Sequence, residues 1–457
     1  MSGGGGLMQL VAYGAQDVYL TANPQVTFFK QLYRRHSNFA MESIEQTFNG
    51  VASFGKKVTA TISRNGDLIS KVYLQATLPE VGTDVSAGFS WIPFIGQYLI
   101  KQVEIEIGGQ LIDRHYGDWL HIWNELTLPA AKARNYLHMV NGYGGLQATG
   151  TACVDECSDS EPGCTPGRFV SQLAANGTDY LVCGEITDVS TSCLPEHTLY
   201  VPLEFWFNRH YGLALPLIAL QYHEVKINVE FNELKYLIET VGFTAGQRAA
   251  AINNLNSAGL VAASLWVDYI YLDTEERRRF AQVAHEYLIE QLQFTGDESV
   301  TSNSNKIKLD LNHPVKEIVW VVQNPSYLDC TGTNNQPYNY SDSNGNNPVA
   351  VAKIQLNGHD RFAEREGPYF NRVQPFQHHT ASPSTGINVY SFAIRPEEHQ
   401  PSGSCNFSRI DNGVLNMTLT PGAFDGDNIK SNLVRVYAVN YNVLRIMAGM
   451  GGLSYSN

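Results

Sequence analysis

Charged side chains are scarce in this chain of 457 residues, because Asp, Glu, Lys and Arg make up only 16% of it, against roughly 25% in an ordinary soluble domain. An excess of basic residues is also missing: 44 acidic residues outnumber 31 basic ones and leave a net charge of −13 at pH 7. A protein whose main task is to bind nucleic acid needs a basic face that displaces counterions from the phosphates. The composition therefore argues against direct nucleic-acid binding.

Long apolar runs are missing as well. The longest, residues 211–222, is too short to cross a bilayer and contains Pro216. The first 16 residues have neither a basic n-region nor an unbroken apolar segment, which argues against a secretory signal. Ser2 stands where N-myristoylation requires glycine. We therefore expect a protein that is soluble when made.

Cysteine is infrequent, with seven residues in an odd set. In a chain without an export signal, free thiols in a reducing compartment are the expected state. Five of the seven lie between residues 153 and 193, where a disulfide or a zinc site stays open as an alternative. The paired C-x₂-C spacing of structural zinc sites is missing from this segment.

Strand formers dominate what is present. Gly, Asn, Thr, Tyr and Phe are abundant and long Glu/Lys/Ala-rich stretches are nearly absent, which favours strands and turns. Four segments alternate between apolar and polar residues: KVTATISR (57–64), VEIEIGG (103–109), HEVKINVEF (223–231) and KIKLDL (306–311). In the second segment, Ile105 should face inward while Glu104 and Glu106 face outward. Such alternation is typical of half-buried strands in a sandwich of two antiparallel sheets.

Helix signals are few. Residues 23–36 have Asn23 as a cap, Pro24 at the first helical position and apolar residues at helical spacing, so they predict a short N-terminal helical segment. Residues 273–287 open on Asp273 and place acidic before basic side chains, the order that the helix dipole favours. This second helix lies between two strand-rich halves and is interpreted as a linker.

The two halves repeat each other. Ile44-Glu45-Gln46 recurs as Ile289-Glu290-Gln291, 245 residues later, and the segments that follow each copy match in order. Each half holds about eight strands, so we predict an all-β fold of two tandem eight-stranded antiparallel jelly-roll sandwiches. The expected organisation is an N-terminal arm (1–26), a first jelly roll (27–272), a linker (273–285) and a second jelly roll (286–457). Two polar segments, 140–197 and 325–349, are expected to be long solvated loops.

Catalytic, cofactor-binding and metal-binding residues are not identified. His378 and His379 are adjacent, and neighbours on a strand point to opposite faces, so they are interpreted as a solvated loop pair. Asp113-Arg114-His115 and Asp360-Arg361 recur at matching places, which favours a structural role. Glu104 and Glu106 could flank a sugar as in glycosidases, but no aromatic platform is identifiable around them. A phosphate-binding loop and a nucleophile elbow are missing. We expect no enzyme and no cofactor.

A basic and aromatic cluster near the N-terminus is unusual in an acidic protein. Its residues are Phe28, Phe29, Lys30, Tyr33, Arg34, Arg35 and His36. Two interpretations stay open: contact with an acidic partner or a lipid surface, or a helix packed on its own domain with local salt bridges. Candidate glycosylation sites are the Asn-x-Ser/Thr positions Asn176, Asn339, Asn406 and Asn416. Without a signal peptide, glycans from the secretory route are not expected there.

The whole chain resembles the major capsid proteins of the nucleocytoplasmic large DNA viruses, and most of all the phycodnavirus type. The segments that carry the resemblance are LVAYGAQDVYLTANPQVTFFK (10–30), ISRNGDLI (62–69), VEIEIGGQLID (103–113), GLALPLIALQYHEVK (212–226), HEYLIEQLQFTG (285–296), KIQLNGHDRF (353–362), QPSGSCNFSRIDN (400–412) and NYNVLRIMAGMGGL (440–453). The Cys-rich stretch 153–193 has no counterpart in the family and looks like a lineage-specific insertion.

The resemblance implies a double jelly roll that homotrimerises into a pseudo-hexagonal capsomer of an icosahedral virion shell, assembled in the host cytoplasm. Neighbouring capsomers and minor capsid proteins would be partners. Phe28, Phe29, Arg34 and Arg35 become candidate contacts on the inner face, close to an internal viral membrane. Family members can carry glycans made by viral enzymes. The alternative is a double-jelly-roll carbohydrate-active enzyme or lectin, which needs a cleft of convergent carboxylates and aromatics.

Overall fold

The computed structural model describes residues 4–80, 89–141, 171–173, 179–181, 196–240, 244–328, 335–424 and 431–455. The chain divides into two compact units, Met1–Phe39 and Ala40–Asn457. The first unit is an arm with two short helices, α1 (Gly5–Val11) and α2 (Val18–Thr21). Its large apolar side chains are all exposed from Leu7 to Tyr33.

The helix expected over residues 23–36 is wrong, because this stretch is not helical and the helical turns lie upstream of it. Asn23 adopts a left-handed conformation with φ 52°, and Pro24 after it disfavours the right-handed helical region for Asn23. An isolated helix of this length is marginal in water, and none of the apolar side chains here is buried.

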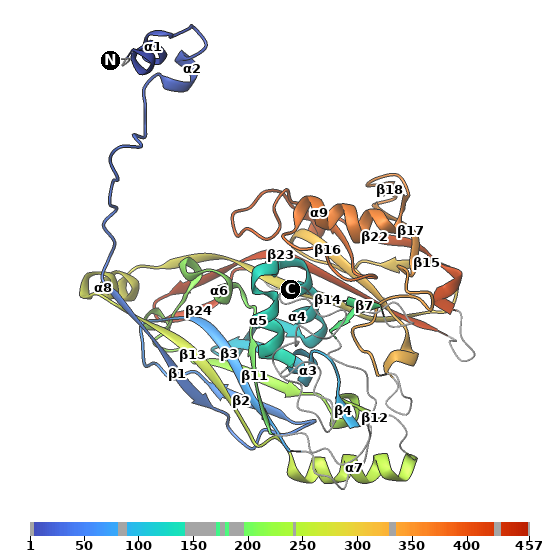
Figure 1. Cartoon of the computed structure of the whole chain (residues 1–457). Helices are drawn as coiled ribbons and strands as arrows, with labels where there is room; N and C mark the ends of the chain where they lie inside the picture. Colours follow the sequence, from blue (N-terminus) through green and yellow to red (C-terminus); the bar gives the residue numbers. More distant parts are fainter. Residues whose placement is uncertain are drawn as a thin grey trace. The chain divides into compact units, whose positions relative to one another are not determined.

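The second unit contains a first sandwich of two antiparallel sheets (Figure 1). Its long sheet has the strand order β1 (Phe39–Thr47), β13 (Ala262–Leu272), β3 (Leu68–Leu78) and β10 (Leu215–Pro216), and β9 (His197–Pro202) also pairs with β3. Its short sheet has the order β2 (Lys57–Thr61), β11 (Val225–Phe231), β5 (Ile100–Ile107) and β6 (Gln110–Tyr116). Two small ribbons pair β12 (Ile238–Thr240) with β4 (Phe89–Trp91) and β7 (Ser171–Leu173) with β8 (Asp179–Leu181).

The second sandwich has the same plan. Its long sheet has the order β14 (His285–Val300), β23 (Asn432–Met447), β16 (Pro314–Gln323) and β20 (Asn388–Ser391), with β21 (Cys405–Asn406) on β16 and β24 (Met450–Leu453) on β23. Its short sheet has the order β15 (Ser304–Lys308), β22 (Gly413–Leu419), β17 (Val349–Leu356) and β18 (His359–Asp360), with β19 (Arg365–Glu366) on β17.

The strand orders confirm the internal duplication. In the long sheets, β1 pairs with β13 and β14 pairs with β23, so the first strand of each sandwich pairs with its last long strand. In the short sheets, β2 pairs with β11 and β15 pairs with β22 in the same way. The repeated Ile-Glu-Gln lies on β1 in one half and on β14 in the other. The all-β prediction of two tandem antiparallel sandwiches is therefore confirmed.

Helical segments fill the connections. The α-helices of the second unit are α3 (Ile95–Leu99), α4 (Gly117–Thr127), α5 (Ala130–Asn141), α6 (Trp206–Arg209), α7 (Ala245–Ala258), α8 (Thr274–Gln282) and α9 (Gln374–His378). The 3₁₀ turns are η1 (Tyr211–Leu213), η2 (Leu217–Ala219), η3 (Leu234–Tyr236), η4 (Pro325–Leu328), η6 (Phe407–Arg409) and η7 (Pro421–Phe424), and η5 (Tyr369–Val373) is a π-helix. Helix α8 confirms the helix expected from residue 273, and the Asp273 side chain caps its first N–H group. None of the helices in the described part of the chain is long and apolar enough to span a bilayer.

The core forms where the alternation predicts it. Val103, Ile105 and Ile107 are fully buried between the two sheets of the first sandwich. The expected exposure of Glu104 is wrong, because this side chain is buried on the other face of β5. Its carboxylate lies 2.8 Å from Nζ of Lys57 and 2.7 Å from Arg114. Burial would raise the pKa of Glu104, but the two cations outweigh it and lower that pKa.

One of the two long loops expected to be solvated differs from that expectation. Segment 325–349 is not simply solvated, because residues 335–342 are mostly buried. Asn335 donates hydrogen bonds to the carbonyl oxygens of Tyr236 and Ile238, and Tyr338 and Tyr340 pack into the interior. Polar residues can be buried in this way because their hydrogen bonds are made within the protein. Most of segment 140–197, with its cysteines, lies outside the described residues; Cys405 is a half-buried free thiol.

Candidate functional site

The two sandwiches share an apolar contact region, which we call the seam. Helix α4 of the first sandwich lies on the outer face of the second long sheet, the face turned away from its own core. The buried side chains of the seam are Trp119, Ile122, Trp123 and Leu126 from α4, together with Val319, Val321, Tyr338, Tyr340, Ile387, Val389, Tyr437 and Val439. At its centre the ring of Trp119 lies 5.6 Å from that of Tyr437. Burial of so many large apolar side chains stabilises the contact between the two sandwiches.

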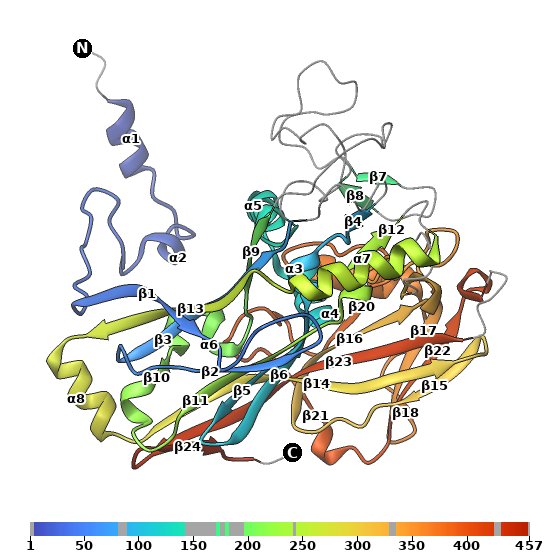
Figure 2. The same cartoon turned by 90° about the horizontal axis from the view of Figure 1, so that it is seen from below.

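The long strands also cross the seam. Figure 2 shows β23 running from the second sandwich to the underside of the first, where Leu444 and Ile446 join the core of the first sandwich with Ile289 of β14. Near this point the buried carboxylate of Asp113 accepts a hydrogen bond from the backbone N–H of Leu292 at 3.0 Å. The two sandwiches therefore share strands as well as a helix contact.

The recurrent Asp-Arg positions make structural contacts, but different ones. Asp113 is buried and its Oδ2 lies 3.0 Å from Nε2 of His115. Asp360 is exposed and binds Lys353 at 3.1 Å and Gln355 at 2.6 Å. The former position joins two sandwiches, whereas the latter stabilises a hairpin of the second one.

A charged cluster closes one side of the seam. The Glu290 carboxylate lies 2.7 Å from Nζ of Lys316 and 2.8 Å from a guanidinium nitrogen of Arg209. The Arg209 guanidinium also covers the ring of Trp123 at 4.0 Å. Burial alone would raise the pKa of Glu290, but Lys316 and Arg209 outweigh it and lower that pKa to about 2. Glu290 therefore stays ionised and pairs cations from both sandwiches.

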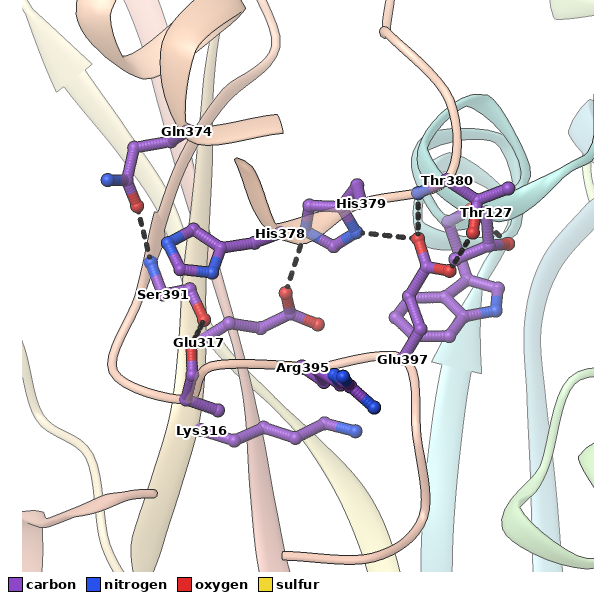
Figure 3. Close-up of polar contacts among 12 residues, drawn as sticks. Thr127, Lys316, Glu317, Gln374, His378, His379, Thr380, Ser391, Arg395 and Glu397 are labelled. Carbon is purple, nitrogen blue, oxygen red and sulfur yellow. Dashed lines mark hydrogen bonds and ion pairs between the residues drawn. The ribbon is translucent and has the colours of Figure 1, made fainter. Parts of the chain in front are cut away.

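His379 contacts Glu317, the residue that follows Lys316 of this cluster (Figure 3). Its Nε2 is 3.1 Å from Oε2 of Glu317, and its Nδ1 is 3.0 Å from Oε1 of Glu397. The Glu397 carboxylate also accepts the backbone N–H of Thr380 at 2.7 Å. Burial would lower the pKa of His379, but the two carboxylates raise it to about 9. The imidazolium therefore joins the segment after α9 to strand β16 and to the loop that carries Glu397.

The interpretation of the histidine pair as solvated is wrong for His379, whose side chain is fully buried. The pair lies at the end of a helical turn and not on a strand, so the argument from alternating faces does not apply. Within the described residues, no group of three or more His, Cys, Asp or Glu side chains is arranged to hold a metal ion.

A second ionic contact lies at the opposite end of α4. The Arg435 guanidinium on β23 pairs with Asp118 on α4, and it also lies 2.8 Å from Asp297 on β14. Burial raises the pKa of the Asp118 carboxyl, and Arg435 opposes this. The α4 helix is thus held to the second long sheet by ions as well as by apolar packing.

The candidate contact residues near the N-terminus belong to the first unit. Phe28 and Phe29 are 93% and 97% exposed, and Arg34 and Arg35 are exposed in the same unit.

The candidate glycosylation sites differ in exposure. Asn339 is 2% exposed, and its Nδ2 donates to Gln336. Asn416 is half-buried and donates to Gln355. Asn406 is exposed, and Asn176 lies outside the described residues. A glycan on Nδ2 needs a free nitrogen at the surface, which favours Asn406 among the described sites.

The seam residues were not identified from the sequence, although two signals point to them. Trp119 and Trp123 are spaced one helical turn apart, which places both on one face of a helix. Strand β16 is apolar on both faces, as expected for a sheet covered on both sides. The ion pairs around Glu290 and His379 join segments far apart in sequence and leave no local signal.

Comparison with known proteins gives a consistent result. Residues 27–273 match the family model described as major capsid protein N-terminus, and residues 276–452 match that of the large eukaryotic DNA virus major capsid protein. The major capsid proteins of Phaeocystis pouchetii virus and Pyramimonas orientalis virus are each 51% identical, with 99% of this chain and 100% of each relative covered. A quasi-atomic model of the PBCV-1 virus capsid matches with a TM-score of 0.69 and 36% identity, covering 94% of this chain and 100% of that one.

These relatives are structural components of virions, and the matches extend over nearly the entire chain together with both sandwiches. The chain belongs to the family of major capsid proteins of large eukaryotic DNA viruses.

Proposed function

We propose that three copies of this chain form a trimer that serves as a pseudo-hexagonal capsomer in an icosahedral shell. The observation that carries the proposal is the duplication itself: two sandwiches with the same strand order are held side by side by a buried seam. Three copies then present six similar units, and closed symmetry of this kind is the usual form of soluble homo-oligomers. Neighbouring capsomers complete the shell, which is assembled in the host cytoplasm.

The proposed division of the chain places the first jelly roll at 27–272, the linker at 273–285 and the second jelly roll at 286–457. It is supported by α8, which occupies the stretch between the last strand of the first sandwich and the first strand of the second. Residues 1–26 are proposed as the N-terminal arm, and the first compact unit, Met1–Phe39, extends beyond it.

The first unit, Met1–Phe39, is proposed to contact minor capsid proteins and an internal membrane on the inner side of the shell, through Phe28, Phe29, Arg34 and Arg35. Its support is the exposure of these aromatic and basic side chains, since large exposed apolar groups mark interaction sites. Deletion of residues 1–26 should leave the two sandwiches folded but impair particle assembly. A deletion product without native circular dichroism would assign this segment to the core instead.

Native mass spectrometry of the purified protein tests the trimer. The expected species has about three times the 50.7 kDa mass of one chain, and negative-stain images should show compact particles of hexagonal outline. A protein that remains monomeric at every concentration tested would contradict the proposal. The carbohydrate-active alternative gains no support from the structure, because Glu104 is engaged by Lys57 and Arg114, and Glu106 accepts a hydrogen bond from Asn228.

A further inference from the structure

The second sandwich carries a counterpart of the seam helix α4. Both helical segments follow the end of a short sheet: α4 follows β6, and residues 369–378, here called the twin helix, follow β19 and comprise η5 and α9. A Cβ atom at Gly117 would overlap the carbonyl oxygen of Ile100, the first residue of β5. A Cβ atom at Gly367 would overlap the carbonyl oxygen of Val349, the first residue of β17. Each helix therefore starts against the same point of its own sandwich.

Counting from the two glycines gives the corresponding positions. Leu120 and Phe370, three residues on, are both fully buried in the core of their own sandwich. The two segments therefore correspond at their first turn, where α4 is an α-helix and η5 is a π-helix, and the residues beyond it are aligned by their position after the glycine.

The outward faces differ in burial. Trp123 and Leu126 of α4 are 4% and 0% exposed because the second sandwich covers them. Their counterparts on the twin helix, Val373 and Phe376, are 40% and 82% exposed. The twin helix thus presents to solvent the same face that α4 buries in the seam, at the surface beside β16 (Figure 1).

The receiving surfaces correspond as well. In the seam, Val319 of β16 pairs with Tyr437 of β23 and Val389 of β20, and this row on the outer face of the second long sheet is buried. Val319 lies six residues before Pro325, the proline that follows the end of β16 at Gln323.

On the first long sheet the residue six positions before Pro79 is Tyr73 of β3. It pairs with Trp266 of β13 and Pro202 of β9, so the three side chains form an equivalent row on the outer face. All three are only partly buried. A cavity of about 350 Å³ is lined by Tyr73 and Pro202 of this face and also by Trp123, Arg209 and Glu397 near the seam.

We propose that the twin helix of one copy packs on the outer face of the first long sheet of the next copy, with Phe376 and Val373 against Tyr73 and Trp266. The inference rests on the proposed trimer and names its contact. The same contact made three times, head to tail, closes a ring in which every sandwich covers the next one. Charge is compatible with this pairing, because Arg372 is exposed on the twin helix and Asp268 lies on the receiving face.

The first test is Phe376→Asp, which places a charge in the proposed contact. Because Phe376 is 82% exposed in one chain, the variant should fold with unchanged circular dichroism. The trimer of this variant should dissociate at protein concentrations at least about thirty-fold higher than the wild-type trimer does. A change of this size is expected when one hot-spot residue of an interface is lost. Tyr222→Asp is the matched control: Tyr222 is 76% exposed, lies outside the contact, and should leave the trimer unchanged. Should Phe376→Asp fail to fold, Phe376→Ser is measured in its place.

The second test is a disulfide cross-link between copies, which does not depend on a change in the stability of the trimer. Chains with Phe376→Cys are co-expressed with chains carrying Trp266→Cys, and mild oxidation should join one of each into a disulfide-linked dimer, whereas either variant alone should give none. Wild-type protein that is monomeric would overturn the trimer itself. A wild-type trimer that Phe376→Asp leaves unchanged, without the mixed disulfide, would overturn this contact while the trimer stands.

Discussion

The buried imidazolium of His379 should make the stability of this protein fall at alkaline pH. The pKa of His379 is about 9 in the folded chain, above the 6.5 of an unperturbed histidine, because Glu317 and Glu397 outweigh the effect of burial. A group whose pKa is raised on folding stabilises the native state fully below its unfolded pKa. That contribution is lost as the pH rises through the folded pKa.

The magnitude follows from the two values. The difference of 2.5 between 9 and 6.5 corresponds to about 3 kcal/mol, since one pKa unit is worth about 1.36 kcal/mol. The side chain is 0% exposed, so screening by solvent removes little of it. Below pH 6 the full contribution should be present, and by pH 10 most of it should be gone.

The assay compares urea unfolding of the wild type and of His379→Gln at pH 6 and pH 10, followed by tryptophan fluorescence. Glutamine can still donate a hydrogen bond to Glu317 but carries no charge. The variant should therefore be less stable by about 3 kcal/mol at pH 6, and the difference should shrink strongly at pH 10. His36→Gln, in the exposed arm, is the control and should follow the wild type. An equal difference between wild type and His379→Gln at both pH values would refute the reasoning.

Three further predictions concern the seam and its twin. Arg435→Met removes the partner of Asp118, whose side chain is only 15% exposed, and should cost about 3 kcal/mol of unfolding free energy in urea; an unchanged midpoint would show that water replaces the arginine. Trp123→Ala should cost about 3–5 kcal/mol in the same assay because it leaves a cavity in the seam, and an exposed control such as Tyr222→Ala should cost little. Gly367→Ala should cost about 1–3 kcal/mol by forcing the twin helix away from Val349, and wild-type melting would contradict the close approach.

The sequence predicts the parts of this fold that depend on local pattern. The alternation of Val103, Ile105 and Ile107 identifies a strand and its buried face, because a period of two specifies a face without knowledge of its neighbours. The order of such strands in two halves was then sufficient to recognise the duplication. The arm shows the limit of local signals: Asn23 and Pro24 are good helix-start residues, but a helix without an apolar partner is marginal.

The seam could not be predicted in the same way because it depends on pairings across the whole chain. Glu104 on β5 can be buried because two cations pair with it. Arg114 comes from the adjacent strand β6, and Lys57 comes from β2, which is separated from β5 by β11. His379 is buried because Glu317 and Glu397, from distant segments, neutralise it. Before those contacts are known, each of these residues is an ordinary polar side chain for which exposure is the expected state.

Helix α4 and the twin helix use corresponding faces for two different contacts, one within a chain and the other, as proposed, between copies. The seam forms within a single chain, so Ile122 and Trp123 of α4 never need to be soluble on their own. The twin helix faces water until copies meet, and at the corresponding positions it carries Arg372 and Val373. A charged and a smaller apolar residue reduce the exposed patch of the free chain, whereas Phe376 remains as the anchor. We therefore expect the contact between copies to be weaker than the seam, so that trimers dissociate before the two sandwiches of one chain separate.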